Sequence, residues 1–159
     1  MSIEQQAELA QSFVSGVVER FGLDAAVGVQ TSEEEILVQV TGTDLGLLVG
    51  QRGVTLDALQ ELTRTVVQRR TDEHTARLVV DVAGFRQKRA AALENFTRQV
   101  AAGVLETGEA EALEAMSAAD RKIVHDAVNS IDGVTTTSEG VEPRRYVVIR
   151  PASAGNDAD

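Results

Sequence analysis

The spacing of apolar residues predicts both helices and strands along this chain. Apolar positions three and four residues apart are typical of a helix with one buried face. On that basis helices are expected over residues 3–22, 54–70, 84–106 and 117–130. Runs rich in β-branched residues predict strands near 25–30 and over 36–41, 76–83, 134–138 and 145–150. A short helical stretch is expected at 42–50 and a short strand within 107–116.

Local signals define the ends and the apolar faces of these helices. Gly22 is expected to cap the end of the first helix, Asp44 to cap the start of the short one, and Ser117 to begin a capping-box-like pattern. The predicted apolar faces are Ile3, Leu9, Phe13, Val17 and Phe21 in 3–22; Leu56, Leu59, Leu62, Thr63, Val66 and Val67 in 54–70; and Phe85, Leu93, Phe96, Val100 and Val104 in 84–106.

The order of these elements is α-β-β-α-α-β followed by α-(β)-α-β-β. This order lacks the regular strand–helix alternation of a doubly wound sheet, so it favours an α+β protein made of two small modules. We expect the first module over residues 1–83, the second over 84–151, and a polar, disordered tail at 152–159.

Charge is distributed unevenly along the chain, and this changes the ligands that it is expected to bind. The formal net charge is −10, and an acidic protein repels polyanions. Residues 51–105, however, hold nine bases and six acids, whereas residues 1–50 hold one base and eight acids. A local basic surface can therefore bind phosphates, through contacts that should be sensitive to salt.

Composition argues against several classes of protein. Cysteine is absent, which removes disulfides and thiolate chemistry, and the first residues do not form a signal peptide. No apolar run approaches the roughly 20 residues that span a membrane, so a cytoplasmic protein without membrane insertion is expected. The chain has two histidines and no H-E-x-x-H, G-x-S-x-G or P-loop motif, which argues against an enzyme, a metal site or a bound cofactor.

Two glycines bracket a polar pair where the helix 54–70 begins, in the sequence Gly50-Gln51-Arg52-Gly53. Glycine permits backbone conformations that other residues resist, and it leaves no Cβ to block a close neighbour. Free N–H groups and the positive end of the helix dipole would face an approaching anion, and Arg52 adds a cation. Spacing alone favours a tight turn between helices, but the flanking strands and the basic middle of the chain favour a phosphate site.

A second motif places Arg121 and His125 four residues apart, on one face of the helix 117–130. Arginine can bind phosphate oxygens with two N–H groups, and histidine can hydrogen-bond a phosphate or a sugar. Spacing alone favours a plainer interpretation, an exposed arginine beside a histidine that packs on a strand.

Both motifs resemble nucleic-acid-binding domains when their surroundings are included. The G-x-x-G loop between a short and a longer helix resembles that of the KH domain, and the preceding helix and strand match its bacterial type II arrangement. The segments "MSAADRKIVHDAV" and "SEGVEPRRYVVIRP" resemble the R-three-H domain, which is named for its Arg-x-x-x-His pair. Gln51 stands where KH loops are often basic, which implies a weaker clamp, and Asp120 stands where the second domain usually has Glu.

The succession of these two domains resembles the Jag family, also called KhpB, EloR or SpoIIIJ-associated protein, over residues 1–151. The resemblance implies a regulator that binds single-stranded RNA and acts in cell elongation and envelope synthesis. It also implies single-stranded DNA as a second ligand, and a small KH-domain protein or a second copy as partner. Many members carry an N-terminal Jag domain that has no counterpart here, so contacts made by that domain are not expected. A protein–protein scaffold that uses the same two folds is the alternative.

The residues expected to contact RNA lie in the two motifs or are basic. Arg86, Lys88 and Arg89 open the helix 84–106, where they form either a solvated face or one wall of a groove between the modules. Aromatic residues make up only 3% of the chain, so base stacking and sequence preference should be weak. The full set of expected contact residues is Gly50, Gln51, Arg52, Gly53, Arg86, Lys88, Arg89, Arg121, Lys122, His125, Arg144 and Arg145.

Overall fold

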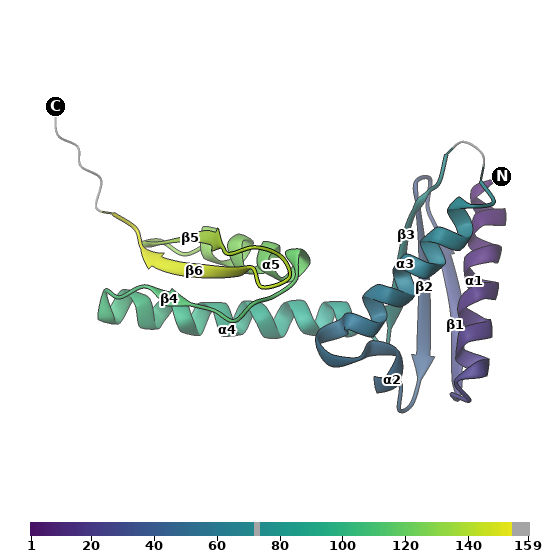
Figure 1. Ribbon diagram of the computed structural model, residues 1–159, viewed down its shortest axis with the longest axis horizontal. Coiled ribbons are helices and arrows are strands. Elements are labelled where there is room, and N and C mark those ends of the chain that lie inside the picture. The colour runs from purple at the N-terminus through teal and green to yellow at the C-terminus, as the bar shows by residue number, and fades with distance from the viewer. Residues whose placement is uncertain (72–73, 154–159) are drawn as a thin grey trace. The chain divides into compact units, whose positions relative to one another are not determined.

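The computed structural model describes residues 1–71 and 74–153, and it divides the chain into two compact units, Met1–Arg86 and Gln87–Asp159. Each unit has its own three-stranded sheet and its own helices, and the elements follow one another in the predicted order (Figure 1). The α+β fold class is therefore confirmed. Most of the expected disordered tail, residues 154–159, lies outside the described residues.

The first unit packs its two long helices against one face of a sheet. Its elements are α1 (Ile3–Arg20), β1 (Ala25–Thr31), β2 (Glu35–Gly42), α2 (Gly46–Val49), the short 3-10 helix η1 (Gln51–Gly53), α3 (Val54–Gln68) and β3 (Arg77–Val82). The central strand β2 pairs antiparallel with β1 and parallel with β3. Helix α1 contacts β1 and α3, and α3 contacts β3, so the two helices lie side by side (Figure 1).

Alternation along β2 explains why this sheet has one covered face. Ile36, Val38 and Val40 are buried in the core of the first unit, whereas the residues between them are partly exposed. Because successive side chains of a strand point to opposite faces, the apolar set packs beneath the helices.

The cap predicted at the end of α1 is confirmed, and the cap predicted at the start of α2 is wrong. Gly22 has φ +67°, its N–H donates to Glu19 O, and the N–H of Leu23 donates to Val18 O. These two bonds form a Schellman cap. Helix α2, in contrast, has Leu45 as its N-cap and no side-chain cap, because it begins one residue too late for Asp44 to take that role.

Most residues of the apolar faces predicted for α3 and for the helix 84–106 are buried, whereas the buried face of α1 is shifted from the predicted one. The residues of α1 that are fully buried include the small side chains Ala7 and Ala10, and Phe21 is half exposed. Leu62 of α3 is 57% exposed, and Phe96 in the second unit is 48% exposed. The periodicity argument counted large apolar side chains. In α1, alanines face the sheet instead, because their small side chains let the helix lie close to it, and the larger residues lie at the sides of the helix.

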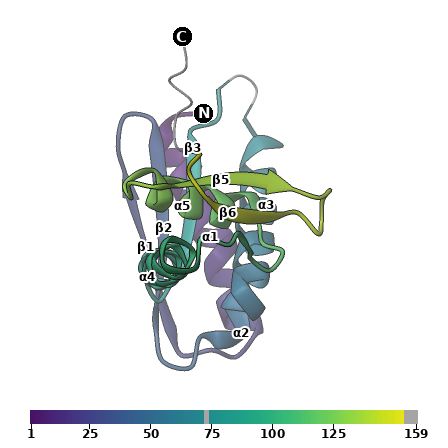
Figure 2. The same ribbon diagram turned by 90° about the vertical axis from the view of Figure 1, so that its left-hand side faces the viewer.

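The second unit packs two helices against an antiparallel sheet. Its elements are α4 (Phe85–Thr107), whose first two residues belong to the first unit, β4 (Glu111–Ala112), α5 (Ala118–Asn129), β5 (Val134–Glu139) and β6 (Tyr146–Pro151). The sheet order is β4-β6-β5, and the β5–β6 hairpin can be followed in Figure 2. Residues of both helices and of the sheet share one apolar core, among them Val104, Val124 and Ile149.

The predicted start of α5 is also observed. Ser117 is the N-cap, and its Oγ accepts a hydrogen bond of 3.2 Å from the N–H of Asp120. The Asp120 carboxylate pairs with Arg89 instead of completing a capping box. Among the helices of the described ranges, none is long and apolar enough to cross a membrane.

Leu56 and Leu62 allow the observed core to be tested against the predicted apolar stripe. Leu56 is fully buried, so we expect Leu56→Ala to lower the free energy of unfolding by about 3 kcal/mol. Leu62→Ala removes the same atoms from an exposed position and should change it by less than about 0.5 kcal/mol. Urea unfolding followed by far-UV circular dichroism measures both. Equal losses in the two variants would contradict the observed burial.

Candidate nucleic-acid interface

The Gly50–Gly53 loop has a backbone that requires glycine at both ends. Gly50 has φ +71° and Gly53 has φ +81°, which are conformations that L-residues resist. A Cβ on Gly50 would collide with Thr55 Oγ1, and a Cβ on Gly53 would lie 2.6 Å from Phe85 Cε1. The two glycines therefore serve a tight turn, as their spacing alone indicates.

The same turn exposes the polar pair at the start of α3. Gln51 and Arg52 are exposed, and Gly53 is buried as the N-cap of the helix, with no side-chain cap on the first turn. The N–H of Val54 donates to Gln51 O, and the dipole of the helix start favours an anion. The turn and the anion site are therefore compatible properties of one loop.

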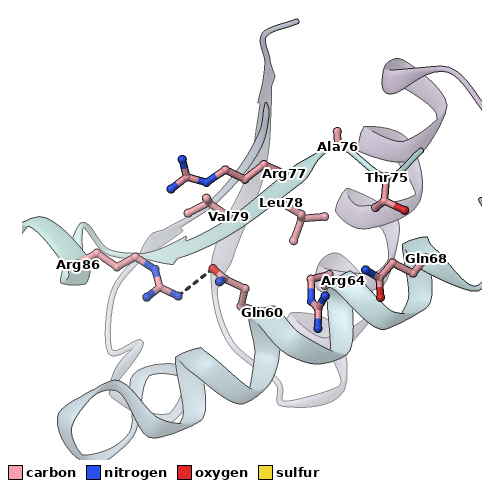
Figure 3. Close-up of a pocket in the computed structure, with 9 residues that line it drawn as sticks. All are labelled: Gln60, Arg64, Gln68, Thr75, Ala76, Arg77, Leu78, Val79 and Arg86. Carbon is pink, nitrogen blue, oxygen red and sulfur yellow. Dashed lines mark hydrogen bonds between the residues drawn. The ribbon is translucent and has the colours of Figure 1, made fainter. Parts of the chain in front are cut away.

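A pocket of about 460 Å³ lies between α3 and β3 in the first unit (Figure 3). Figure 3 shows Gln60 reaching from α3 towards Arg86, whereas the guanidinium of Arg77 points away from α3. The lining combines amide, hydroxyl and guanidinium groups with a short apolar stretch of β3. Its residues are Gln60, Arg64, Gln68, Thr75, Ala76, Arg77, Leu78, Val79 and Arg86.

Arg86 is fixed at one end of this pocket by the edge of β3. Its Nε donates to Val80 O at 3.0 Å, and its Nη2 donates to Gln60 Oε1 at 3.0 Å. The same Gln60 oxygen accepts the N–H of Val80 at 3.0 Å, so both outward-facing backbone groups of Val80 have partners. Asp57 Oδ1 lies 3.3 Å from Nη1 and is the carboxylate partner of the guanidinium.

Arg64 on the pocket rim is paired along its own helix. Its guanidinium binds the Glu61 carboxylate at 2.5 and 3.1 Å. This hydrogen bond lowers the pKa of Glu61 below its ordinary value, so the carboxylate stays charged. The pair is exposed, and such pairs contribute little to stability, so a phosphate could exchange with Glu61.

The Arg-x-x-x-His pair of the second unit fixes the β5–β6 hairpin. Arg121 is 7% exposed, and its guanidinium donates to Met116 O at 2.8 Å and to the Glu142 carboxylate at 2.5 Å. Both ring nitrogens of His125 are bonded to hydroxyls of β5, at 2.6 and 2.8 Å. His125 packs on a strand, as the plainer interpretation expected, but Arg121 is buried and not exposed.

The remaining predicted contact residues differ in their surroundings. Lys122 is 76% exposed at its side chain and lies 2.6 Å from Asp126. Arg144 and Lys88 are exposed, and Arg145 is half-buried. Arg89 pairs with Asp120 at 3.1 Å within the second unit.

Sequence reasoning missed the two residues that hold Arg86, Asp57 and Gln60. Their spacing of three residues on α3 was the available signal. Within the described ranges, no group of three or more histidine, aspartate or glutamate residues is arranged to hold a metal ion.

Comparisons with known proteins match both units. The model of the KhpA/KhpB KH domain matches residues 7–82, and that of the R-three-H domain matches residues 91–151. The RNA-binding protein KhpB of Clostridium symbiosum is 35% identical over 127 residues, which are 80% of this chain and 57% of that protein. The RNA-binding protein KhpB of Bacillus subtilis (strain 168) is 32% identical over 91% of this chain and 69% of its own length.

The match to a third relative spans a smaller share of that protein. The RNA-binding protein KhpB of Streptococcus pneumoniae serotype 2 is 31% identical over 92% of this chain and 44% of that protein. This chain therefore spans about half the length of the Clostridium and Streptococcus relatives.

The burial of Arg121 predicts a structural effect that its exposed neighbour lacks. Arg121→Ala leaves Met116 O and Glu142 without their charged donor, so we expect the second unit to lose about 2 kcal/mol of unfolding free energy. Lys122→Ala should change it by less than about 0.5 kcal/mol. The chain has one tyrosine, Tyr146 in β6, and no tryptophan, so its fluorescence during urea unfolding reports on the second unit. Equal midpoints for the two variants would show that Arg121 has no structural role.

Proposed function

This chain belongs to the KhpB family, in which a KH domain precedes an R-three-H domain, and from that premise we propose that it binds single-stranded RNA. The observation that carries the proposal is the Gly50–Gly53 loop. It joins a tight glycine backbone, an exposed Arg52 and a helix start without a side-chain cap in one place. Phosphate oxygens of a nucleic-acid strand suit all three features.

The pocket between α3 and β3 supports a path for the strand beyond the loop. Its amide, hydroxyl and guanidinium groups can hydrogen-bond base edges, sugars and phosphates. The sugar–phosphate backbone would bind at the loop, and the bases would rest along α3 and β3. With few aromatic residues to stack on bases, binding should depend mainly on the backbone and show modest sequence preference.

The second unit contributes a weaker contact in this proposal. Exposed Lys122 on α5 and exposed Arg144 are the cations best placed to meet phosphates, while Arg121 and His125 hold the β5–β6 hairpin that carries Arg144. Two weak sites on one chain bind one strand more tightly than either site alone, because binding at the first site raises the effective concentration of the strand at the second. Single-stranded DNA is the second ligand of the same chemistry.

The biological role is part of the same proposal. We infer a cytoplasmic, non-enzymatic regulator that acts after transcription on cell elongation and envelope synthesis. The relatives named RNA-binding protein KhpB support the RNA-binding part of this inference.

A protein contact is a second candidate function, and exposed apolar residues favour it. Leu47 of α2 and Val54 and Leu62 of α3 are large apolar side chains that are more than half exposed. All three lie on the α2–loop–α3 segment, and large apolar side chains left exposed on one segment can contact a protein partner. A small KH-domain protein or a second copy of this chain would be the partner, and the scaffold alternative would use this surface without RNA.

The loop can be tested by reversing its charge without touching the glycines. We expect wild-type protein to bind a labelled single-stranded RNA with micromolar, salt-sensitive affinity, and Gln51→Asp with Arg52→Asp to weaken binding at least about 10-fold. The matched control is Arg98→Asp with Gln99→Asp, which makes the same charge change at exposed positions of α4. Fluorescence anisotropy at two salt concentrations measures all three proteins.

Two outcomes would contradict the proposal. Retained affinity in the loop variant would remove the loop from the binding site. Absence of wild-type binding at about 50 mM salt would favour the scaffold, and light scattering of Leu62→Arg would then show whether the apolar surface mediates assembly.

A further inference from the structure

Residues 83–90 lie between the two matched domains, yet the structure uses two of them to build the first unit. The KH match ends at residue 82, and the R-three-H match begins at residue 91. Phe85 and Arg86 open α4, and both belong to the compact unit Met1–Arg86. Their contacts are with the loop, with α3 and with the edge of β3.

Phe85 supports the second glycine of the loop. Its side chain is half-buried and packs against the core of the first unit. The ring lies so close to Gly53 that a Cβ there would come within 2.6 Å of Cε1 and 3.3 Å of Cζ. The ring thus occupies the space beside Gly53 and restricts where α3 can begin.

Arg86 is an ordered cation at one end of the α3–β3 pocket. Its three hydrogen bonds to Val80, Gln60 and Asp57 use three of the five N–H groups of a guanidinium. Contacts within the described residues thus leave two N–H groups to donate to a ligand. The side chain is 34% exposed, so a ligand in the pocket can reach it.

We propose that Phe85 and Arg86 complete the RNA-binding groove of the first unit, with Phe85 positioning the Gly50–Gly53 loop and Arg86 binding a phosphate of the strand. This inference rests on the proposed RNA-binding function. It assigns part of the site to the segment that joins the two domains, outside both of them.

The fixed geometry of Arg86 makes it a better phosphate ligand than its neighbours. Arg64 and Arg77 are more exposed, and they pair with the exposed carboxylates Glu61 and Glu35. A phosphate that replaced those carboxylates would have to order the side chains itself, whereas Arg86 stays held by the strand carbonyl and Gln60. Its carboxylate partner Asp57 is more than half exposed, so a phosphate can replace that carboxylate without leaving a buried charge unpaired.

The Arg86 part is tested by comparing Arg86→Gln with Arg98→Gln, a control on the exposed face of α4. With the single-stranded RNA used above, Arg86→Gln should bind about 10-fold more weakly, because a charge-assisted hydrogen bond is lost. The slope of log K against log salt should fall by about 0.7, the value for one phosphate contact with a single strand. Arg98→Gln should bind like wild type.

The Phe85 part is tested with Phe85→Ala, the conservative Phe85→Leu, and Phe96→Ala as the control that removes an exposed phenyl ring. Hydrogen exchange at the Gly53 and Val54 amides in RNA-free protein should be at least about 10-fold faster in Phe85→Ala only. RNA affinity should fall in the same variant with no change in salt slope, and Phe85→Leu should restore both.

These outcomes separate the inference from the proposed function. If wild type binds RNA and the Arg86→Gln and Phe85→Ala variants bind equally well, the inference is wrong and the proposed function stands. If wild type does not bind RNA, the proposed function and the assigned phosphate contact of Arg86 are both wrong. Unchanged loop exchange in Phe85→Ala would in either case overturn the positioning role.

Discussion

The close approach of Gly53 to the Phe85 ring is the contact on which the candidate site of the first unit depends. The absence of a Cβ lets the ring fill the space beside the loop, and the left-handed backbone of Gly53 turns the chain into α3. Once α3 begins there, its next turns place Asp57 and Gln60 where Arg86 can reach them. The loop, the helix start and the fixed guanidinium are consequences of one packing arrangement.

Several arginines of this acidic protein form ion pairs with its carboxylates. Arg64, Arg86, Arg89 and Arg121 each lie within ion-pair distance of a carboxylate. A nucleic-acid strand would therefore gain less from long-range attraction than it would on a basic protein. It would bind by exchange, with phosphates replacing exposed carboxylates, and this exchange is inexpensive only where the departing carboxylate returns to water. The exposure of both the guanidinium and its carboxylate partner thus determines which arginines can bind a phosphate: Arg86 and Asp57 are both accessible, whereas Asp120 beside Arg89 and the guanidinium of Arg121 are largely buried.

The sequence predicted the fold more fully than the site, for a physical reason. Periodicity and cap residues are local, so the element order, the Gly22 cap and the Ser117 cap follow from them, and the family resemblance is confirmed by the matched domains. Contacts between distant segments are not local. Neither the burial of Arg121 against Glu142 nor the exposure of Leu62 follows from spacing, because each depends on the neighbours that packing brings.

The two motifs also differ in what their characteristic residues do in the structure. In the glycine loop, the conspicuous glycines create a backbone shape, and Arg52 is the exposed cation between them. In the second unit, the conspicuous Arg121 and His125 hold β5 and its hairpin, and the exposed cation beside them is Lys122. A motif residue with a buried guanidinium already bonded to a carbonyl and a carboxylate would have to break those bonds to bind phosphate. Arg86 differs because its own side chain is 34% exposed, against 9% for Arg121. A phosphate can therefore reach the Arg86 guanidinium while the carbonyl and amide partners keep the group ordered.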